Sequence, residues 1–471
     1  MFKFLFSLLL TFLFFFRSIL PAFALISYEE EEKIGKEVLQ EISKKIEIIK
    51  DVEVNAYVNA LGKYLLQKGV ALTPFNFRFF LIKDKTFNAF SVPGGYIFIN
   101  TGVFNYVVSE DELAAVLAHE ISHNLARHVA KRIETIKRMQ IAATAATLAA
   151  ILLGGGQAGE IVSVTSTALA QTKLLSYSRE DEEEADRMGF EIYTKAGFNP
   201  KAMVNIFERL AKESRFAIEL NLKYLFTHPL PQERVTYLQN LAEKFYPKRE
   251  GENAFSRDPL YFQRLKAKVK ALSEDSSDLI LALRVQLREK EDPMTRYQLA
   301  LALMQARFLN DAERELILAL KSLPYRDYFL LDQAELYFIK GDYQKAIEIL
   351  KVLTFKDHNL AYILELKSKY LLARSYMEMG DLRSSYEVFK ALNEERIMQE
   401  DPYFYFYFGL LCSKIDLLGE SHFYFGKFYE KKGDFKTALY HYKRALSFLE
   451  KDSKIYIEAE EKVKTMEKKK P

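Results

Sequence analysis

Turn residues that recur between amphipathic helices constrain the second half of this chain more than any other feature. Four turn pairs occur there, at Asn310-Asp311, Gly341-Asp342, Gly380-Asp381 and Gly433-Asp434. Gly, Asn and Asp favour turns, so each pair predicts the connection between two helices. A succession of such helix pairs predicts an all-α array, because each pair can bury its apolar face only against its neighbours.

Residues 331–354 and 423–446 share a fuller pattern of helix, Gly-Asp-aromatic turn and a helix that contains Lys/Thr-Ala. The pattern resembles tetratricopeptide repeats, in which a small residue after the turn lets the two helices approach closely. The turns are 31, 39 and 53 residues apart. The last interval divides if Ile415-Asp416 is a degenerate turn, and the helix over residues 418–431 would then serve two successive repeats. The pattern predicts the class of array and leaves the number of repeats open.

The first half of the chain is mixed. Polar helices are expected from about residue 29 to 49 and from about 54 to 68. Residues 75–82 alternate apolar and polar side chains, and residues 96–100 follow Pro93-Gly94-Gly95, so both segments predict strands. Residues 246–253 combine Pro, Gly and charge, as linkers do. The predicted organisation is a signal over 1–24, a mainly helical α+β domain over 25–246, a linker with connecting helices over 247–290, and the repeat array over 291–465.

The N-terminus resembles an export signal. Lys3 precedes an apolar stretch over residues 4–16, and Ala22-Phe23-Ala24 fits a cleavage site. The alternative is a membrane anchor that runs to about Ile26. Arg17 and Pro21 interrupt that span, and about 20 apolar residues are needed to cross a bilayer. Both interpretations place the rest of the chain outside the cytoplasm.

Charge and cysteine content exclude several classes of function. The chain has 67 basic and 64 acidic side chains and no strongly basic stripe, so nucleic acid is not an expected partner. One cysteine, Cys412, excludes an intramolecular disulfide and a zinc site built from several cysteines. Histidine is scarce, with seven residues, so its positions are informative.

One motif carries chemistry: residues 119–123 match the pattern H-E-x-x-H. Ser109 and Glu112 form a capping box, which predicts a helix from residue 110. His119 and His123 then lie one turn apart and can reach one metal ion, while Glu120 lies about 100° round the helix as a general base. The alternative is a helix with two hydrogen-bonded histidines and no metal.

Two further positions bear on this motif. His128 is nine residues after His119, which predicts the opposite, solvated face of the helix. Zinc needs a third protein ligand, and Glu182, 59 residues after His123, is the candidate. Ser178 caps its helix and Asp186 shares its face, where a second carboxylate can hold a ligand histidine. The alternative is an acidic first turn that complements the helix dipole.

Four motifs in order carry a family resemblance. They are Asn88-Ala89-Phe90-x-x-Pro93-Gly94-Gly95, the H-E-x-x-H motif, Ser178-Arg179-x-x-Glu182-x-Glu184-Ala185-Asp186, and Thr227-His228-Pro229 with Arg234. The set resembles the HtpX-like and CaaX-prenyl-protease gluzincins and, with an export signal and a repeat tail, their soluble periplasmic, β-barrel assembly-enhancing branch. The resemblance implies a zincin-type fold that binds one zinc ion through His119, His123 and Glu182, with Glu120 as base and Asp186 behind the ligands.

Two other sites have physical interpretations. Gly94-Gly95 before residues 96–100 suits an edge strand that accepts an extended substrate, so Asn88, Gly94, Gly95 and Tyr96 are assigned to substrate binding. The alternative there is an ordinary hairpin. His228 either stabilises the transition-state oxyanion or binds zinc as a removable fourth ligand, and the resemblance suggests self-inhibition. A third possibility is a loop histidine without a part in the chemistry. Arg234 is expected to pair with a carboxylate and fix that loop.

The segment over residues 141–175 is apolar and has Gly154-Gly155-Gly156 at its middle. Its part over residues 142–153 has only 12 residues, which is too short to span a bilayer. We expect core helices over the active-site cleft, with peripheral membrane contact as the alternative. The predicted activity is zinc-dependent peptide hydrolysis, with the repeats recruiting substrate. By resemblance, the substrates are misfolded or stalled outer-membrane proteins, the partner is the β-barrel assembly machinery and the location is the periplasm. The contrasting hypotheses are a chaperone or adaptor with a latent protease site, and a structural scaffold.

Overall fold

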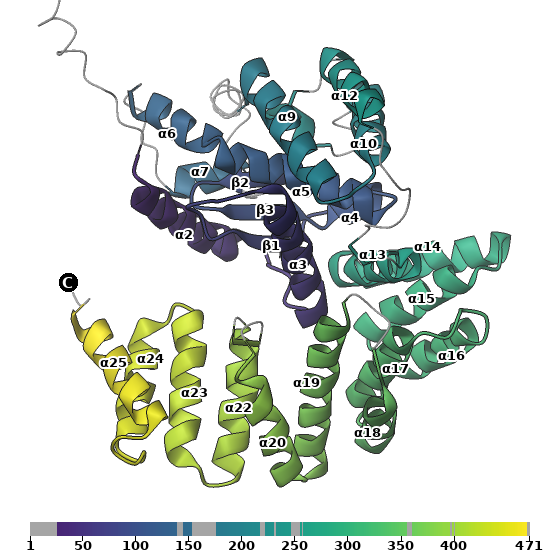
Figure 1. Ribbon diagram of the computed structural model, residues 1–471. Coiled ribbons are helices and arrows are strands. Elements are labelled where there is room, and N and C mark those ends of the chain that lie inside the picture. The colour runs from purple at the N-terminus through teal and green to yellow at the C-terminus, as the bar shows by residue number, and fades with distance from the viewer. Residues whose placement is uncertain are drawn as a thin grey trace, which may run out of the picture.

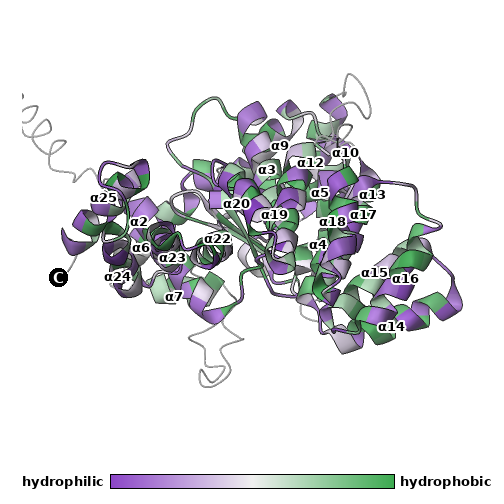
Figure 2. Cartoon of the chain, turned by 90° about the horizontal axis from the view of Figure 1, so that it is seen from below, coloured by the Kyte–Doolittle hydropathy of each residue, from purple (hydrophilic) through white to green (hydrophobic). Residues whose placement is uncertain are grey.

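The computed structural model describes residues 26–138, 145–152, 176–216, 222–229, 232–245, 255–256, 258–355, 360–395, 398–399 and 401–468. The predicted export signal, the glycines at 154–156 and residues 246–253 of the predicted linker lie outside these ranges. A body that contains a sheet packs over a row of helices (Figure 1). Hydrophilic and hydrophobic residues alternate along the helices of both parts (Figure 2), as partly buried helices require.

The sheet-containing body is mainly helical, as the sequence predicts. Its elements are α2 (Tyr28–Lys45), α3 (Val52–Gly69), β1 (Arg78–Ile82), β2 (Ala89–Val92), β3 (Tyr96–Asn100), α4 (Gly102–Tyr106), α5 (Glu110–Leu125), α6 (His128–Arg138), α7 (Ala145–Leu152), α9 (Arg179–Lys195), α10 (Pro200–Glu213), the 3-10 turn η1 (Ser214–Phe216), α11 (Tyr224–Thr227) and α12 (Gln232–Lys244).

The three strands have the order β1-β3-β2, with β1 parallel and β2 antiparallel to β3. The prediction that residues 96–100 form an edge strand is therefore wrong, because both sides of β3 are paired. A local pattern of apolar residues does not encode strand order. The edge next to α5 is β2. Phe98 on β3 lies between Phe80 on β1 and Phe90 on β2, with ring centroids 5.2 Å apart on both sides.

Helix α5 begins where the capping residues predict. Ser109 Oγ accepts a hydrogen bond from the Glu112 amide at 3.3 Å, and the Glu112 carboxylate accepts from the Val108 amide at 2.8 Å. The helix packs against β2 and α9, so its middle is buried. Gly189 on α9 allows close packing, since a β-carbon there would lie 3.3 Å from the backbone of Ala118. This contact brings the start of α9 beside the end of α5.

The rest of the chain is helical and is arranged in successive antiparallel pairs, as predicted. Its helices are α13 (Pro259–Ser273), α14 (Ser276–Glu289), α15 (Pro293–Gln305), α16 (Leu309–Leu320), α17 (Asp327–Lys340), α18 (Tyr343–Val352), α19 (Ala361–Met379), α20 (Leu382–Leu392), α22 (Pro402–Lys414), α23 (Leu418–Lys431), α24 (Phe435–Leu446) and α25 (Lys454–Lys468).

Three of the predicted Gly-Asp pairs form the turns between helices. Gly341, for example, has a φ of 82°, which favours glycine, and Asp342 caps α18 by accepting from the Lys345 amide. The pair Asn310-Asp311 is an exception, because it lies inside α16 and the chain turns earlier, at Arg307 with a φ of 64°. Asp416 has a φ of 61° at the predicted degenerate turn, and α23 packs against both α22 and α24.

A buried network of charges joins the two parts. Figure 1 shows α3 extending from the sheet to α19, which it contacts. The guanidinium of Arg264 on α13 binds Glu53 of α3 and donates to both carboxylate oxygens of Asp332 on α17, at 2.6 and 2.8 Å. We call the set the interface network; its members are Glu53, Arg264, Lys268, Asp332, Glu335 and Lys367.

Candidate metal centre

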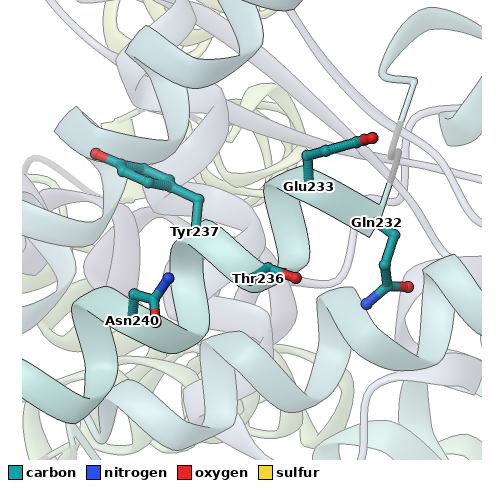
Figure 3. Close-up of a pocket in the computed structure, with 5 residues that line it drawn as sticks. All are labelled: Gln232, Glu233, Thr236, Tyr237 and Asn240. Carbon is teal, nitrogen blue, oxygen red and sulfur yellow. The ribbon is translucent and has the colours of Figure 1, made fainter.

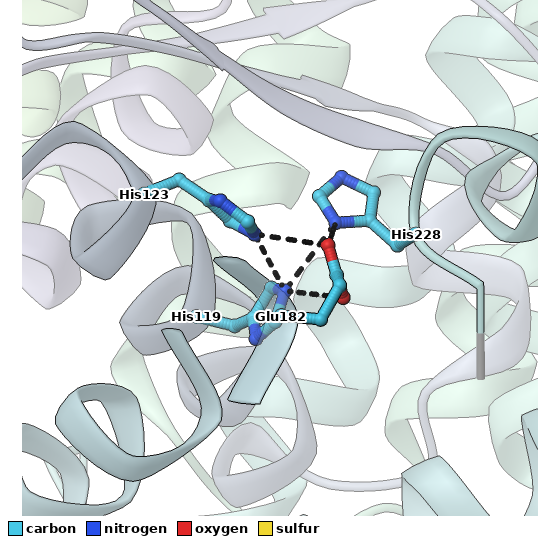
Figure 4. Close-up of side chains that lie close together, drawn as sticks. All are labelled: His119, His123, Glu182 and His228. Atoms are coloured by element: carbon cyan, nitrogen blue, oxygen red, sulfur yellow. Dashed lines mark hydrogen bonds and ion pairs between the residues drawn. The ribbon is translucent and has the colours of Figure 1, made fainter. Parts of the chain in front are cut away.

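Helix α5 places two imidazole rings one turn apart and away from solvent. His119 and His123 are both fully buried, and their Nε2 atoms lie 3.0 Å from each other. Helix α9 adds the carboxylate of Glu182, and the loop after α11 adds His228. Figure 4 shows these four side chains converging from three separate parts of the chain. All four are buried, and each offers one donor atom to a common centre.

The spacing of the four donor atoms suits a tetrahedral metal ion. Nδ1 of His228 lies 2.9 Å from Oε1 of Glu182 and 3.4 Å from Nε2 of His119. Nε2 of His123 lies 3.4 Å from Oε1 of Glu182. Bonds of 2.0–2.1 Å from zinc to nitrogen or oxygen put tetrahedral ligands about 3.3 Å from one another. The described donors therefore already have nearly the separations that zinc requires.

The charges of the centre also fit a divalent cation. Burial lowers the pKa of His123, and it lowers the pKa of His228 to about 4 although the Glu182 carboxylate opposes this, so both rings are neutral at pH 7. Three carboxylates, those of Glu120, Glu182 and Asp186, then meet one guanidinium, that of Arg234. When Glu120 is ionised, two negative charges remain in excess, which is the charge that one zinc ion would balance; without the ion, a proton on Glu120 would relieve part of this excess.

Glu120 lies beside the donor set without belonging to it. Its carboxylate is fully buried, and Oε1 is 3.6 Å from Nε2 of His228. Neither carboxylate oxygen makes a hydrogen bond of normal geometry with the part of the chain that the structure describes. Burial and the charge of Glu182 raise its pKa well above the usual range, and the Tyr224 hydroxyl and the Ser91 amide offset only part of this effect. This carboxylate is therefore poised to take up a proton.

Asp186 and Arg234 lie behind the donors. Oδ1 of Asp186 is 3.1 Å from Nδ1 of His119, which fixes the orientation of that ring. Arg234 donates to both carboxylate oxygens of Asp186, at 2.7 and 2.8 Å, and also pairs with Glu182. The same guanidinium donates to the Pro229 carbonyl at 2.5 Å, so it holds the loop that carries His228.

The prediction of a solvated His128 is wrong. Its side chain is buried, with Nδ1 2.9 Å from Nδ1 of His123 and Nε2 3.0 Å from the Glu184 carboxylate. The helical extrapolation fails because α5 ends at Leu125. Arg127 adopts a left-handed φ of 57°, and α6 starts at His128 in a new direction. The sequence signal that could have shown this turn is weak, since arginine has no preference for that conformation.

The residues assigned to substrate binding lie at and near the β2–β3 turn. The Gly95 amide donates to the Asn124 side chain at 3.0 Å, and Gly94 has a left-handed φ of 82°. The Tyr96 hydroxyl donates to Glu32 of α2 at 2.9 Å, so this side chain points away from the donors. The Asn88 side chain lies 3.5 Å from the Leu152 carbonyl of α7.

Two tyrosines line the centre and were not identified from the sequence. The ring of Tyr177 stacks on His123 with centroids 3.9 Å apart, and the ring of Tyr224 stacks on His228 at 4.2 Å. Neither belongs to a motif with fixed spacing. Helix α7 packs against α2, and its Leu148 belongs to the same buried apolar cluster as Phe90 of β2. The described part of the apolar segment 141–175 is thus a core helix near the centre.

A hollow of about 390 Å³ lies elsewhere, on the outer side of α12 (Figure 3). It is lined by Gln232, Glu233, Thr236, Tyr237 and Asn240. Arg234 and Leu238 are buried on the opposite side of the same helix, so the hollow does not open on the metal centre. Among the helices that the structure describes, none is both long and apolar enough to cross a membrane.

Comparisons with known proteins agree with this geometry. The model of Peptidase family M48 matches residues 45–242, which include all four donors and Glu120. The beta-barrel assembly-enhancing protease of Yersinia pestis is 32% identical over 316 residues, which are 65% of this chain and 63% of the relative. The protein of that name from Escherichia coli strain K12 is 32% identical over 47% of this chain and 46% of its own. The chain thus spans about half to two thirds of the length of these relatives.

Two more distant similarities complete the comparison. The mitochondrial metalloendopeptidase OMA1 of Schizosaccharomyces pombe is 32% identical over 37% of this chain and 49% of its own. A chain in the crystal structure of the APC/C hetero-tetramer Cut9–Hcn1 superposes on 76% of this chain and over 86% of its own length. The sequence identity is 11% and the TM-score is 0.25. That score is too low to bear on the fold.

Proposed function

The chain carries a domain of peptidase family M48 over residues 45–242, and on this premise we propose that it is a zinc-dependent endopeptidase. The observation that carries the proposal is the buried donor set of His119, His123, Glu182 and His228 with the Glu120 carboxylate directly beside it. A zinc ion held there would polarise the scissile carbonyl and acidify the attacking water. Glu120 accepts the proton of that water and passes it to the leaving amine.

The environment of Glu120 supports this role. Burial and the neighbouring charge of Glu182 raise the pKa of the Glu120 carboxyl. A raised pKa makes the carboxylate a stronger base, so it can accept the proton of the attacking water and hold it until the leaving amine takes it. Asp186 and Arg234 keep the ligand carboxylate and the His119 ring in place while this happens.

We place the substrate along β2 instead of β3. In the antiparallel pairing of β2 with β3, Phe90 and Val92 are opposite Phe98 and Tyr96. The Asn100 amide donates to the Asn88 carbonyl, so hydrogen-bonded pairs alternate and the amide and carbonyl of Ser91 point to the free edge. That edge faces Glu120. An extended peptide added there would present its carbonyl to the metal centre.

His228 is proposed to be a removable fourth ligand. Its Nδ1 lies among the other donors at 2.9–3.4 Å, in the position that water or substrate would need. Replacing His228 with alanine tests this directly. Higher turnover supports a latch, lower turnover supports stabilisation of the oxyanion, and unchanged turnover contradicts both interpretations.

The enzyme assignment is tested with Glu120→Gln and a urea-unfolded porin that carries a fluorescent label. General acid–base catalysis contributes about 10²–10⁴-fold, so cleavage by the variant should fall by that factor. Its zinc content should stay at one ion per chain, because Glu120 is not a ligand in the proposal. Cleavage at the wild-type rate would contradict the enzyme assignment. Loss of zinc would contradict the assigned role of Glu120.

The proposed substrates are misfolded or stalled outer-membrane proteins in the periplasm, recruited by the repeat array together with the β-barrel assembly machinery. The support is the name that the bacterial relatives share. A chaperone or adaptor with a latent protease is the second candidate, and the closed donor set favours it. In cells that lack the protein, rescue of barrel assembly by Glu120→Gln would support the second candidate, and failure of rescue would support proteolysis.

A further inference from the structure

A line of three polar groups connects the metal centre to the surface through His128. Nδ1 of His128 lies 2.9 Å from Nδ1 of His123, and Nε2 of His128 lies 3.0 Å from Oε2 of Glu184. The His128 side chain is fully buried, whereas the side chain of Glu184 on α9 is 40% exposed. The first residue of α6 and the sixth residue of α9 therefore meet directly behind one of the proposed ligands.

The direction of the hydrogen bonds follows from the role of His123. Its Nε2 faces the other donors, so a metal ion would use that atom and the ring proton would remain on Nδ1. Nδ1 of His123 then donates to Nδ1 of His128, which can accept only when its own proton is on Nε2. Nε2 of His128 in turn donates to Glu184. Only this arrangement gives each bond one donor and one acceptor.

The two histidines of the motif are thus supported differently. His119 has a buried carboxylate, Asp186, at its Nδ1, whereas His123 has a neutral ring in the corresponding place. Partners of this kind orient a ligand ring, and their loss typically weakens metal binding by about 10–100-fold. We propose that His128 is a positioning residue for His123, that Glu184 holds it in the required tautomer, and that the pair sets the zinc affinity of the centre.

Equilibrium zinc affinity tests this inference, measured on the purified full chain by competition with a chromophoric chelator at pH 7.5. His128→Phe keeps a buried ring of similar size and should bind zinc about 10–100-fold more weakly. His128→Asn places an amide oxygen near the position of Nδ1 and should recover most of the lost affinity. Glu184→Leu alters only the exposed end of the line and should weaken binding by a few-fold.

The repeat array offers a matched control. His422 and His441 also approach through their Nδ1 atoms, at 3.0 Å, but on α23 and α24. His422→Phe should leave zinc affinity unchanged, since it removes the same kind of contact far from the centre.

The inference rests on the proposed zinc site, and the two can fail separately. Failure of the wild-type chain to bind zinc would contradict the proposed function. Tight binding by wild type together with equally tight binding by His128→Phe would contradict the role of His128. A weaker His128→Phe that His128→Asn does not rescue would contradict it as well, because a merely structural ring would behave in that way. If His128→Phe does not fold, Glu184→Leu decides. Binding weakened by a few-fold supports the role of the pair, and unchanged affinity contradicts the role assigned to Glu184.

Discussion

Two buried clusters of charge lie in this protein, and they are built in opposite ways. In the interface network, the carboxylates of Glu53, Asp332 and Glu335, together with Asp51 at its edge, meet three cationic side chains, so the charges nearly balance. In the metal centre, three carboxylates meet only the guanidinium of Arg234. Among the residues that the structure describes, the first cluster lacks one positive charge and the second lacks two.

The pKa values show the consequence of this difference. Burial alone raises the pKa of Glu53, but the charges of Arg264, Lys367 and Lys268 outweigh it and leave the pKa well below the usual range. Burial and a neighbouring carboxylate both raise the pKa of Glu120. A cluster with nearly balanced charges thus stabilises its own ionised form and can hold two parts of the chain together. An unbalanced cluster needs a cation or a proton, which is what a catalytic centre uses.

The largest expected effect comes from breaking the balance of the interface network. Arg264→Met leaves the carboxylates of Glu53 and Asp332 buried without the guanidinium and should lower the free energy of unfolding by about 3–5 kcal/mol. Denaturation monitored by circular dichroism measures it. Arg296→Met is the matched control, because Arg296 also pairs with two carboxylates but nearer the surface, and its loss should cost less than about 1 kcal/mol. Equal losses in the two variants would contradict the comparison.

A comparable effect is expected when the metal centre loses its cation. A ligand present at 1,000 times its dissociation constant stabilises a protein by about 4 kcal/mol, so the zinc-free chain should melt at a lower temperature than the zinc-loaded chain. Scanning calorimetry on both forms gives the difference. Glu120→Gln should show the same difference as wild type, whereas Glu182→Gln should show little. Identical melting of the two wild-type forms would argue against a zinc site.

The smallest expected effect is on folding stability at low pH. Burial raises the pKa of Glu335, but Lys268 and Lys367 outweigh it, so the folded-state pKa is lowered. The stability from this carboxylate is therefore present above its unfolded pKa of about 4.3 and is lost as the pH falls through the folded value. When the pH falls from 6 to 3, the free energy of unfolding of Glu335→Gln should decrease by about 1 kcal/mol less than that of wild type, as measured by urea unfolding. Glu348→Gln on the exposed side of α18 should follow wild type; a steeper loss in Glu335→Gln would reverse the sign assigned here.

The sequence predicts what depends on short spacing. The helix from residue 110, the pair His119 and His123 on one face, and the cap at Ser178 all follow from residues within one or two turns of each other. Glu182 and His228 approach that face only through tertiary packing, and they were assigned because their motifs resemble those of a family. The geometry then brings all four together.

The features that the sequence did not predict depend on contacts between distant residues. The left-handed turn at Arg127 is held by bonds of its side chain to Glu31 and to the Ile26 carbonyl, about 100 residues earlier in the chain. Arg264 and Glu53 are 211 residues apart. Charged side chains are seldom fully buried, so composition favours the surface for both. No local pattern could have paired them.

The bond between Arg264 and Glu53 also bears on how such a chain can change over generations. Repeat arrays often gain, lose or exchange units, because each unit depends mainly on its neighbours. Here the first helices of the array share a desolvated ion pair with α3. Exchange of α13 alone would leave Glu53 of α3 buried without its guanidinium, and exchange of α17 alone would leave Arg264 without the Asp332 carboxylate. Insertion and loss of units should therefore be tolerated only beyond α19, which makes the far end of the array the part that is free to acquire new partners.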